Sequence, residues 1–297
     1  MKITITGASG FVGSNLSKYL EEKGNTVEKL SLRKSDFSLS KDSDELIHLA
    51  GKAHDTANTS SEIEYFEVNT DLTKKLFDQF LQSNLRDFIF FSSVKATADT
   101  VEGVLDENHK SEPQTPYGKS KLEAEKYLLS KPLPKGKRLF IIRPCMIHGP
   151  GNKGNLNLLY KVVEKGLPWP LASFENKRSF LSVGNLNFLL EKIITSDLPS
   201  GIYNFADDNA VSTNQLVKII AEASGRKTKL WYLSAGLIQT VAKVGDLIKL
   251  PLNSERLKKL TESYVVSNQK IKTALKIENL PLSAEEGLEV TIKSFKK

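Results

Sequence analysis

The feature that most constrains the fold is a glycine-rich turn close to the start of the chain. Residues 2–6, Lys-Ile-Thr-Ile-Thr, alternate as a strand does, and Gly-Ala-Ser-Gly-Phe-Val-Gly follows at once with glycines at 7, 10 and 13. The amphipathic pattern over 11–23 predicts a helix that ends at Gly24, a suitable left-handed cap. A strand, a glycine turn and a helix in this order present unpaired helix N–H groups to a pyrophosphate. The turn therefore predicts a dinucleotide-binding fold.

The first half of the chain continues this alternation of strand and helix. The strand pattern Asp-Phe-Ile-Phe-Phe-Ser-Ser at 87–93 is almost entirely apolar, as expected of a parallel strand buried on both faces. Thr115 is a good N-cap and Pro116 a good first residue for a helix that must end before Pro132. These patterns predict an α/β protein with a Rossmann-type doubly wound parallel sheet. The remaining predicted elements are strands at 27–32, 46–51 and 138–149 and a helix at 62–82.

After Gly151 the pattern becomes mixed, and we expect a smaller mixed α/β substrate-binding lobe over 151–297. The NADP(H)-binding Rossmann domain is expected over 1–150, with roughly 179–205 packing back on it. One predicted helix, 234–249, is apolar with an interspersed lysine. It suits a helix that covers the substrate cleft, or alternatively one that touches a membrane surface. The predicted helices of this half are 155–165, 184–196, 212–224, 234–249 and 284–296.

Composition excludes several other classes of protein. The net charge of +7 is not gathered into a basic run with interleaved aromatics, so no nucleic-acid partner is predicted. Cys145 is the single cysteine, which rules out an internal disulfide and fits a cytoplasmic location, as does the absence of a recognisable secretion signal. Lys243 and Asp246 interrupt the longest apolar stretch, so no membrane span is predicted. The four histidines lack metal-ligand spacing, so no metal site is predicted.

The residues after the second strand indicate which dinucleotide is bound. An acidic residue there binds the ribose 2′-hydroxyl of NAD, whereas a basic residue binds the 2′-phosphate of NADP. Ser31 stands where the acid is expected, and Arg33 follows two residues later. An arginine fork suits a phosphate dianion, so NADP(H) is favoured over NAD(H). The alternative is that Arg33 and Lys34 are surface charges and Asp36 is the acid.

Tyr117, Lys121 and Ser93 form a pattern that predicts catalysis by proton transfer. Tyr117 and Lys121 are four apart on one predicted helix, and therefore lie on one face of it. The ammonium is expected to lower the pKa of the phenol, and also to hold the cofactor ribose. Ser93 comes at the carboxyl end of a central strand, the edge where open parallel sheets bind ligands, and its hydroxyl can reach the same substrate oxygen.

These motifs together resemble the extended short-chain dehydrogenases/reductases, in the nucleotide-sugar epimerase/dehydratase group. The resemblance runs through His-Leu-Ala-Gly at 48–51, Pro-Tyr-Gly-Lys-Ser-Lys at 116–121 and Arg-Pro-Cys-Met-Ile-His-Gly at 143–149. It implies a UDP-sugar substrate, a homodimer and catalysis by Ser93, Tyr117 and Lys121. The resemblance implies cofactor contacts at Gly7, Gly10, Phe11, Val12, Gly13, Leu49, Ala50, Gly51 and Asn69. The full set of predicted cofactor contacts adds Ser31, Arg33, Tyr117, Lys121 and Pro144. The predicted substrate contacts are Ser93, Lys95, Tyr117, Asn155 and Arg178, of which Asn155 and Arg178 are candidates for the diphosphate. The alternative for Arg178 is a surface residue.

The residues beside the catalytic serine narrow the reaction. Dehydratases of this group carry an Asp-Glu pair after the Ser/Thr, where this chain has Val94 and Lys95; enzymes that epimerise C3 and C5 carry a cysteine at the position of Val94. The motifs most resemble C4 reductases of UDP-4-keto-6-deoxy-N-acetylhexosamines, which make UDP-QuiNAc or UDP-FucNAc-type sugars for surface polysaccharides. A C4 epimerase with tightly bound NAD is the alternative. A non-catalytic NADP-sensing protein on the same fold is the alternative of another class.

Overall fold

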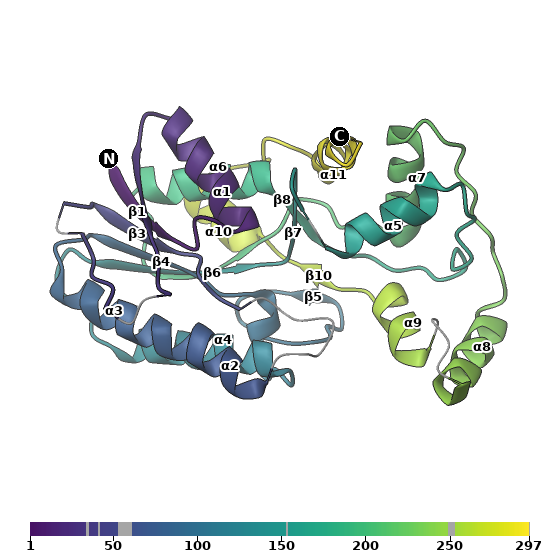
Figure 1. Ribbon diagram of the computed structural model, residues 1–297, viewed down its shortest axis with the longest axis horizontal. Helices are drawn as coiled ribbons and strands as arrows, with labels where there is room; N and C mark the ends of the chain where they lie inside the picture. Colours follow the sequence, from purple (N-terminus) through teal and green to yellow (C-terminus); the bar gives the residue numbers. More distant parts are fainter. Residues whose placement is uncertain (34–35, 41, 53–60, 153, 249–252, 297) are drawn as a thin grey trace.

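A six-stranded parallel sheet is the centre of the molecule (Figure 1). The computed structural model describes residues 1–297 apart from 34–35, 41, 53–60, 153, 249–252 and 297. The strand order is β2-β1-β3-β4-β6-β9, and every neighbouring pair is parallel. This confirms the predicted Rossmann-type α/β class. The strands are β1 (Lys2–Thr6), β2 (Thr26–Leu30), β3 (Glu45–His48), β4 (Asp87–Phe91), β6 (Arg138–Pro144) and β9 (Gly201–Phe205).

Helices cover both faces of this sheet, as its apolar strands require. On β4, Phe88 and Phe90 point into the cluster beneath α3 and α4, while Ile89 and Phe91 point into the cluster beneath α1 and α6. Figure 1 shows the two helical layers on opposite sides of the strands. One layer holds α1 (Phe11–Glu22), α6 (Val183–Thr195) and α10 (Gln269–Leu275); the other holds α2 (Glu62–Phe66), α3 (Leu72–Gln82) and α4 (Pro116–Ser130).

The helix predicted over 62–82 contains one irregular turn. Residues Glu67–Asp71 form a π-helical turn between α2 and α3. A π turn accommodates one extra residue per turn and is often found at functional sites. Here it buries Asn69 and Thr70 against the neighbouring helix, where Thr70 Oγ1 donates to the Ser120 carbonyl at 2.8 Å.

The prediction of a single strand over 138–149 is wrong in one respect. The segment forms two strands, and they belong to two different sheets. β6 ends at Pro144, Cys145 N donates to the Phe205 carbonyl at 3.0 Å, and β7 (Met146–His148) then pairs with β8 (Phe180–Ser182). The sequence shows no interruption at the break, because apolar residues continue from β6 through Cys145, Met146 and Ile147. The chain thereby passes from the main sheet into a second lobe formed around α5 (Asn155–Glu164), α7 (Thr213–Ala223) and α11 (Ala284–Ser294).

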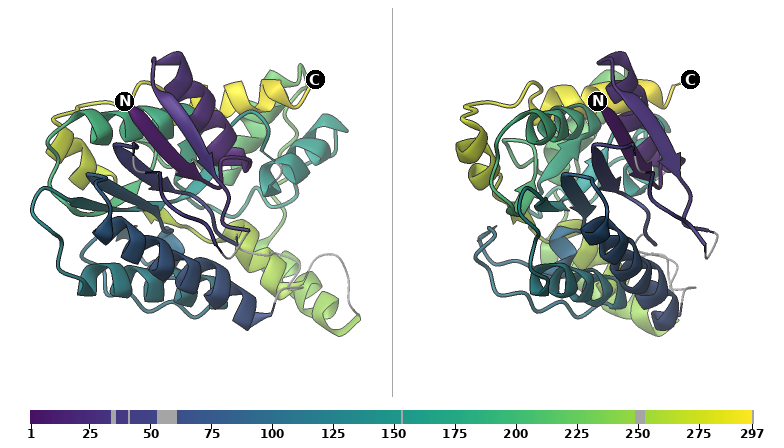
Figure 2. Two further views of the ribbon diagram at one scale, coloured as in Figure 1. Left: turned by 60° about the vertical axis from the view of Figure 1, so that its left-hand side comes forward. Right: turned by 90° about the vertical axis from the view of Figure 1, so that its left-hand side faces the viewer.

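Two further segments complete the second half. The short strands β5 (Val104–Leu105) and β10 (Val265–Val266) pair in parallel, and the helices α8 (Ala235–Ile248) and α9 (Ser254–Thr261) stand together at one end of the long axis (Figure 1). Figure 2 shows the same pair projecting from the body of the molecule. β9, at 201–205, is a strand of the main sheet, so the chain returns to the first lobe after β8. The domain boundaries themselves remain a prediction.

Candidate active site

The glycine turn after β1 is tightly packed by its own backbone. Gly7 has φ 69°, and a Cβ there would lie 2.7 Å from Ala50 N. A Cβ on Gly13 would lie 2.3 Å from the Gly7 carbonyl oxygen. Gly10 is the N-cap of α1 and offers no side-chain capping bond. Gly7 and Gly13 therefore leave no room for a side chain, and their backbone packs closely beside the start of α1, where free N–H groups and the helix dipole suit a pyrophosphate.

The apolar residues predicted beside this turn divide into two groups. Val12 and Leu49 are half-buried and pack against the core cluster of β1, α1 and α6. Phe11 is half-buried at the first turn of α1, and its ring lies beside Gly149 and Gly151, where the chain enters the second lobe. The geometry thus fits the predicted dinucleotide cradle, with Phe11 at the junction of the two lobes.

Asn69 supports the loop after β3. Its Oδ1 accepts from Lys52 N at 2.8 Å, and its Nδ2 donates to the Lys52 carbonyl at 3.1 Å and to Ser120 Oγ at 3.0 Å. A Cβ on Gly51 would lie 2.9 Å from Asn69 Oδ1 and 3.1 Å from Lys121 Nζ. The glycine therefore allows Lys52, the π turn and Lys121, the predicted catalytic lysine, to meet. Its predicted cofactor contact remains a prediction.

A buried hydrogen-bond chain joins the glycine turn to the π turn. Thr6 Oγ1 accepts from Ala50 N at 3.2 Å, so its proton is directed to His48 Nδ1 at 2.6 Å. Thr73 Oγ1 donates to the Asn69 carbonyl at 2.7 Å and receives His48 Nε2–H at 2.9 Å. Burial, assisted by the Lys121 charge, lowers the pKa of His48 to about 3. A neutral imidazole therefore fixes the two turns together over the working pH range.

Ser93, Tyr117 and Lys121 come together at the carboxyl end of β4. Ser93 is buried just after the strand and forms a hydrogen bond with the half-buried Tyr117. Lys121 is 5% exposed, and its Nζ donates to the Phe91 carbonyl at 2.8 Å. The Tyr65 ring packs edge-on against Tyr117 with centroids 6.2 Å apart. A phenol, a hydroxyl and an ammonium thus share one end of the sheet.

The ionisation of the tyrosine differs from expectation. The pKa of Tyr117 is raised above its ordinary value, chiefly by burial, and the Ser93 hydrogen bond opposes this rise. Burial lowers the pKa of Lys121 to about 8, against the favourable charge of Glu125. The expected lowering of the phenol's pKa by the lysine is wrong here, because desolvation has the largest effect on the phenol and the Lys121 ammonium is bonded to the Phe91 carbonyl. Tyr117 is consequently protonated at neutral pH and suited to donate a proton.

The start of α4 is held by residues that sequence reasoning did not single out. A Cβ on Gly118 would lie 2.4 Å from the Lys95 carbonyl oxygen, so only glycine lets α4 approach the turn that carries Ser93. Asp99 Oδ2 accepts from Gln114 N at 2.7 Å, and Asp99 Oδ1 accepts from Thr115 Oγ1 at 3.0 Å. The glycine in Pro-Tyr-Gly-Lys and the lone Asp99 were the available signals, but their partners come from another segment.

A buried ion pair lies behind the catalytic group. Arg143 Nε donates to Glu125 Oε1 at 3.0 Å, and its Nη2 forms a salt bridge with the other carboxylate oxygen. Ser92 Oγ donates to Glu125 as well. Both charged side chains are almost fully buried, at 1% and 3% exposed. Glu125 lies one turn beyond Lys121 on α4, so the pair ties the catalytic helix to β6.

The two residues predicted to choose the cofactor follow β2 on the surface. Ser31 and Arg33 are both exposed, and Ser31 Oγ accepts a weak bond from Arg33 N at 3.4 Å. Asp36, the alternative acid, is also exposed. Lys34 lies outside the described residues. Arg33 therefore carries a solvent-facing guanidinium close to the end of β2, which is compatible with binding a 2′-phosphate.

The predicted substrate contacts lie in different environments. Lys95 is half-buried two residues after Ser93; its Nζ donates to the Asp99 carbonyl at 2.6 Å and lies 4.2 Å from the centre of the Tyr264 ring. Arg178 Nε donates to the Glu262 carbonyl at 3.1 Å, beyond the end of α9. Asn155 is the first residue of α5, and its side chain lies outside the described part of the structure. Pro144, a predicted cofactor contact, is the buried last residue of β6 at the ligand-binding edge.

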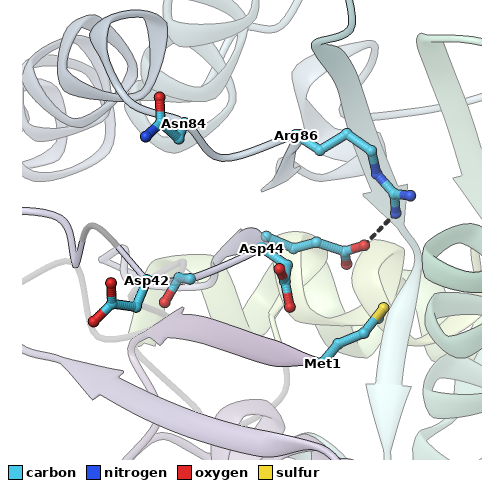
Figure 3. Close-up of a pocket in the computed structure, with 7 residues that line it drawn as sticks. Met1, Asp42, Asp44, Asn84 and Arg86 are labelled. Atoms are coloured by element: carbon cyan, nitrogen blue, oxygen red, sulfur yellow. Dashed lines mark hydrogen bonds and ion pairs between the residues drawn. The ribbon is translucent and has the colours of Figure 1, made fainter.

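The opposite, amino-terminal edge of the sheet has a hollow of about 460 Å³. Figure 3 shows its lining, in which Asp42, Asp44, Asn84 and Arg86 surround the opening near Met1. It lies at the strand starts, away from Ser93, Tyr117 and the glycine turn. Since parallel α/β sheets bind ligands at the carboxyl ends of their strands, the catalytic edge and not this hollow is the candidate active site.

The described residues contain no group of three or more acidic, histidine or cysteine side chains placed to hold a metal ion. Among the described helices, none has the length and apolarity needed to cross a membrane.

Known proteins place this architecture in a family. The model of the NAD dependent epimerase/dehydratase family matches residues 3–206, so the chain belongs to that family. It is 34% identical to a UDP-glucose 4-epimerase of Vibrio cholerae over 78% of this chain and 77% of that protein.

Two further comparisons cover almost the whole chain. An N-acetyl-alpha-D-glucosaminyl-diphospho-ditrans,octacis-undecaprenol 4-epimerase of Escherichia coli O157:H7 is 26% identical over 98% of this chain and 94% of the relative. The solved structure of RMD from Pseudomonas aeruginosa complexed with NADPH superposes with a TM-score of 0.72 at 19% identity, covering 99% and 98% of the two chains. The latter likeness is one of fold.

Proposed function

We propose that this protein is an NADPH-dependent reductase of the C4 carbonyl of a UDP-4-keto-6-deoxy-N-acetylhexosamine. The observation that carries the choice of a reductase with NADPH is the end of β2, where Ser31 offers no carboxylate and Arg33 is exposed. A carboxylate there would bind the ribose hydroxyls of NAD, whereas a guanidinium forms charge-assisted bonds with a 2′-phosphate. Family membership supports nucleotide-sugar oxidoreduction at the site of Ser93, Tyr117 and Lys121.

The residues of this chain divide the chemical work as follows. A bound nicotinamide supplies hydride to the sugar carbon. The raised pKa of Tyr117 keeps its phenol protonated, so that it can give its proton to the oxygen that becomes an alkoxide. Ser93, already hydrogen-bonded to Tyr117, donates to the same oxygen, and this bond strengthens as negative charge develops. Lys121, with its pKa of about 8, keeps a positive charge at neutral pH in this site.

A C4 epimerase with tightly bound NAD is the second candidate. The Vibrio cholerae relative, 34% identical and named a UDP-glucose 4-epimerase, favours it. The same three side chains serve both reactions, because epimerisation removes hydride from C4 and returns it to the other face. The two candidates differ in what happens to the cofactor: a reductase consumes it, whereas an epimerase regenerates it.

One pair of assays separates the candidates. The purified enzyme is mixed with NADPH or NADH and UDP-4-keto-6-deoxy-GlcNAc, and the loss of nicotinamide absorbance is followed. Stoichiometric loss with NADPH is expected. UDP-GlcNAc and UDP-glucose are incubated in parallel without added cofactor. Conversion to the C4 epimer there, with no absorbance change in the first assay, would establish the epimerase. Cofactor binding with neither reaction would favour the non-catalytic alternative.

Arg33 tests the choice of NADPH separately. Arg33→Ala is expected to raise KM for NADPH about tenfold and to leave KM for NADH unchanged, since one charge-assisted contact is worth roughly 1.5 kcal/mol. Arg226→Ala, an equally exposed arginine after α7, is the control and should change neither. A preference of the unaltered enzyme for NADH would contradict the proposed role of Arg33.

A further inference from the structure

Helix α8 has two apolar faces, and only one of them is packed. Ile238, Ala242 and Gly245 form the buried stripe. A second stripe, about 100° around the helix, remains in solvent. Its members Leu237, Val241, Val244 and Ile248 are spaced by four, three and four residues, and Leu247 lies next to them. All five side chains are exposed, from 44% for Val241 to 83% for Leu247. The third face is polar, with Gln239, Lys243 and Asp246.

Exposed aromatic residues lead into this helix. Trp231 and Tyr232 are 54% and 70% exposed, and Leu233 follows them directly before α8. Figure 1 shows that the connection from α7 and the helix itself occupy the same end of the molecule, away from the six-stranded sheet. Aromatic side chains of this kind, apolar with a polar tip, are enriched where hydrocarbon meets water.

The same segment is strongly basic in sequence. Residues 226–261, from the end of α7 to the end of α9, contain eight lysines and arginines and two acids, whereas the net charge of the whole chain is +7. Both acids are engaged within the segment: Asp246 Oδ1 accepts from Ser254 N at 2.9 Å, and Glu255 pairs with Lys259 at 2.6 Å. Lys243 and Lys258 are exposed.

We propose that this surface, consisting of residues 231–233 and the exposed stripe of α8, docks on an anionic lipid bilayer. An amphipathic helix with a basic surround lies in the plane of the headgroups, with its apolar stripe inserted and its lysines among the phosphates. Fourteen residues give α8 a length of about 21 Å, suited to lying along the surface. A second copy of this chain would bring two strongly cationic segments together, which charge repulsion disfavours.

The docking surface is connected to the substrate lobe near the candidate active site. Arg178 Nε donates to the Glu262 carbonyl just beyond α9, and Glu262 and Lys259 both act electrostatically on Lys95, two residues after Ser93. The segment that would dock is therefore bonded, through Arg178, to residues near the candidate active site. The inference is independent of the proposed reaction, because binding is measured without substrate.

Trp231 provides a direct probe. The chain has two tryptophans, and Trp169 is buried at 7% exposure, so a change in emission on adding vesicles reports chiefly on Trp231. Full-length protein is titrated with phosphatidylcholine vesicles containing phosphatidylglycerol and with vesicles of phosphatidylcholine alone. We expect co-sedimentation and a blue shift with the anionic vesicles, weakened by salt and by a neutral composition. Trp231→Phe should remove the blue shift and leave co-sedimentation measurable.

Matched substitutions test which surface is responsible. Leu237→Gln with Leu247→Gln is expected to weaken vesicle binding by about tenfold or more, since two apolar side chains no longer enter the hydrocarbon boundary. Leu158→Gln with Val290→Gln changes residues of comparable exposure on α5 and α11 and should bind as the unaltered protein does. Equal thermal stability of the two double variants excludes misfolding.

Four results would overturn the proposal. The first is no binding to anionic vesicles. The second is equal binding by the α8 variant and its control. The third is self-association: light scattering would show that the unaltered protein is a dimer and the α8 variant a monomer, while neither protein binds vesicles. The surface would then be a dimer interface. A blue shift caused by a nucleotide sugar alone, again without vesicle binding, would assign it to the substrate cleft.

Discussion

The two edges of the central sheet hold buried charge in opposite ways. At the amino edge, Glu45, Asp87 and Arg138 are the first residues of β3, β4 and β6 and stand side by side in register. Arg86 bonds both carboxylates, and Arg138 Nε donates to Asp87 Oδ1 at 2.7 Å. At the carboxyl edge, Lys121 is buried against a backbone carbonyl, and the nearby Glu125 is already bound by Arg143.

The difference teaches where this fold can do chemistry. At the amino edge, guanidinium groups bond the side chains of Glu45 and Asp87, which ties the strand starts together without a ligand cradle beside them. At the carboxyl edge, Glu125 is paired with Arg143. Burial perturbs the pKa values of both Lys121 and Tyr117 there. Such perturbed groups beside a ligand cradle mark a functional site.

Tyr117→Phe should lower kcat by about 10²–10⁴-fold, because it removes the proton donor. Tyr127→Phe, in the same helix with its hydroxyl bonded to Asp78 at the surface, is the matched control and should retain activity. Turnover is measured by cofactor oxidation, and cofactor affinity by fluorescence titration. Tyr117→Phe should leave the affinity for the cofactor nearly unchanged. Full turnover by Tyr117→Phe would remove the catalytic assignment of the carboxyl edge.

Asp87→Ala should lower the free energy of unfolding by roughly 3–5 kcal/mol, since it leaves Arg138 partly buried without its main partner. Asp197→Ala is the control, because Asp197 approaches the same arginine at 4.0 Å but is fully exposed. It should produce no measurable change, as is usual for exposed pairs. Denaturant titration of both variants provides the comparison. Equal stability would mean that the amino edge is not the structural anchor described here.

Gly118→Ala should lower activity strongly while costing about 1–3 kcal/mol of stability, because the added methyl group meets the Lys95 carbonyl and displaces α4 from Ser93. Gly236→Ala is the control. It lies in the first turn of α8, where a Cβ would meet only Ser234 Oγ at 3.8 Å among described neighbours, and it should be neutral or slightly stabilising. Turnover and thermal unfolding are measured together. Unchanged kcat for Gly118→Ala would show that α4 need not approach this closely.

Glu45 should make the amino edge sensitive to pH. Burial, followed by the charge of Asp87, raises the pKa of Glu45 to about 8, against the opposing effect of Arg86. The folded protein therefore binds the extra proton, so stability is fully present below pH 4.5 and is lost as pH rises through about 8, with a slope of at most about 1.4 kcal/mol per pH unit.

Glu45→Gln mimics the protonated carboxyl and should flatten this dependence over the same window. The free energy of unfolding of both proteins is measured at several pH values by denaturant titration. Glu28→Gln is the control, because Glu28 is only partly buried and pairs with Lys2 at 2.9 Å near the same edge. An unchanged slope in Glu45→Gln would place the titrating group elsewhere.

Much of this organisation follows from local pattern. The glycine turn, the apolar run of β4 and the Thr115-Pro116 start of α4 each depend on a few neighbouring residues, and the structure places each as predicted. Two predictions were wrong, and for the same reason. The break at Cys145 and the raised pKa of Tyr117 depend on partners distant in sequence, namely Phe205 for the first and the surrounding burial for the second.

Periodicity, caps and spacing are local, so the sequence alone predicted the parallel α/β class, most of the helices and the meeting of Ser93, Tyr117 and Lys121 at one end of the sheet. Only the tertiary structure decided which carboxylates are neutralised, how closely Gly118 lets α4 approach Ser93, and which face of α8 meets solvent. Those properties depend on desolvation and close contact between segments far apart in the chain, and no short window of sequence contains them.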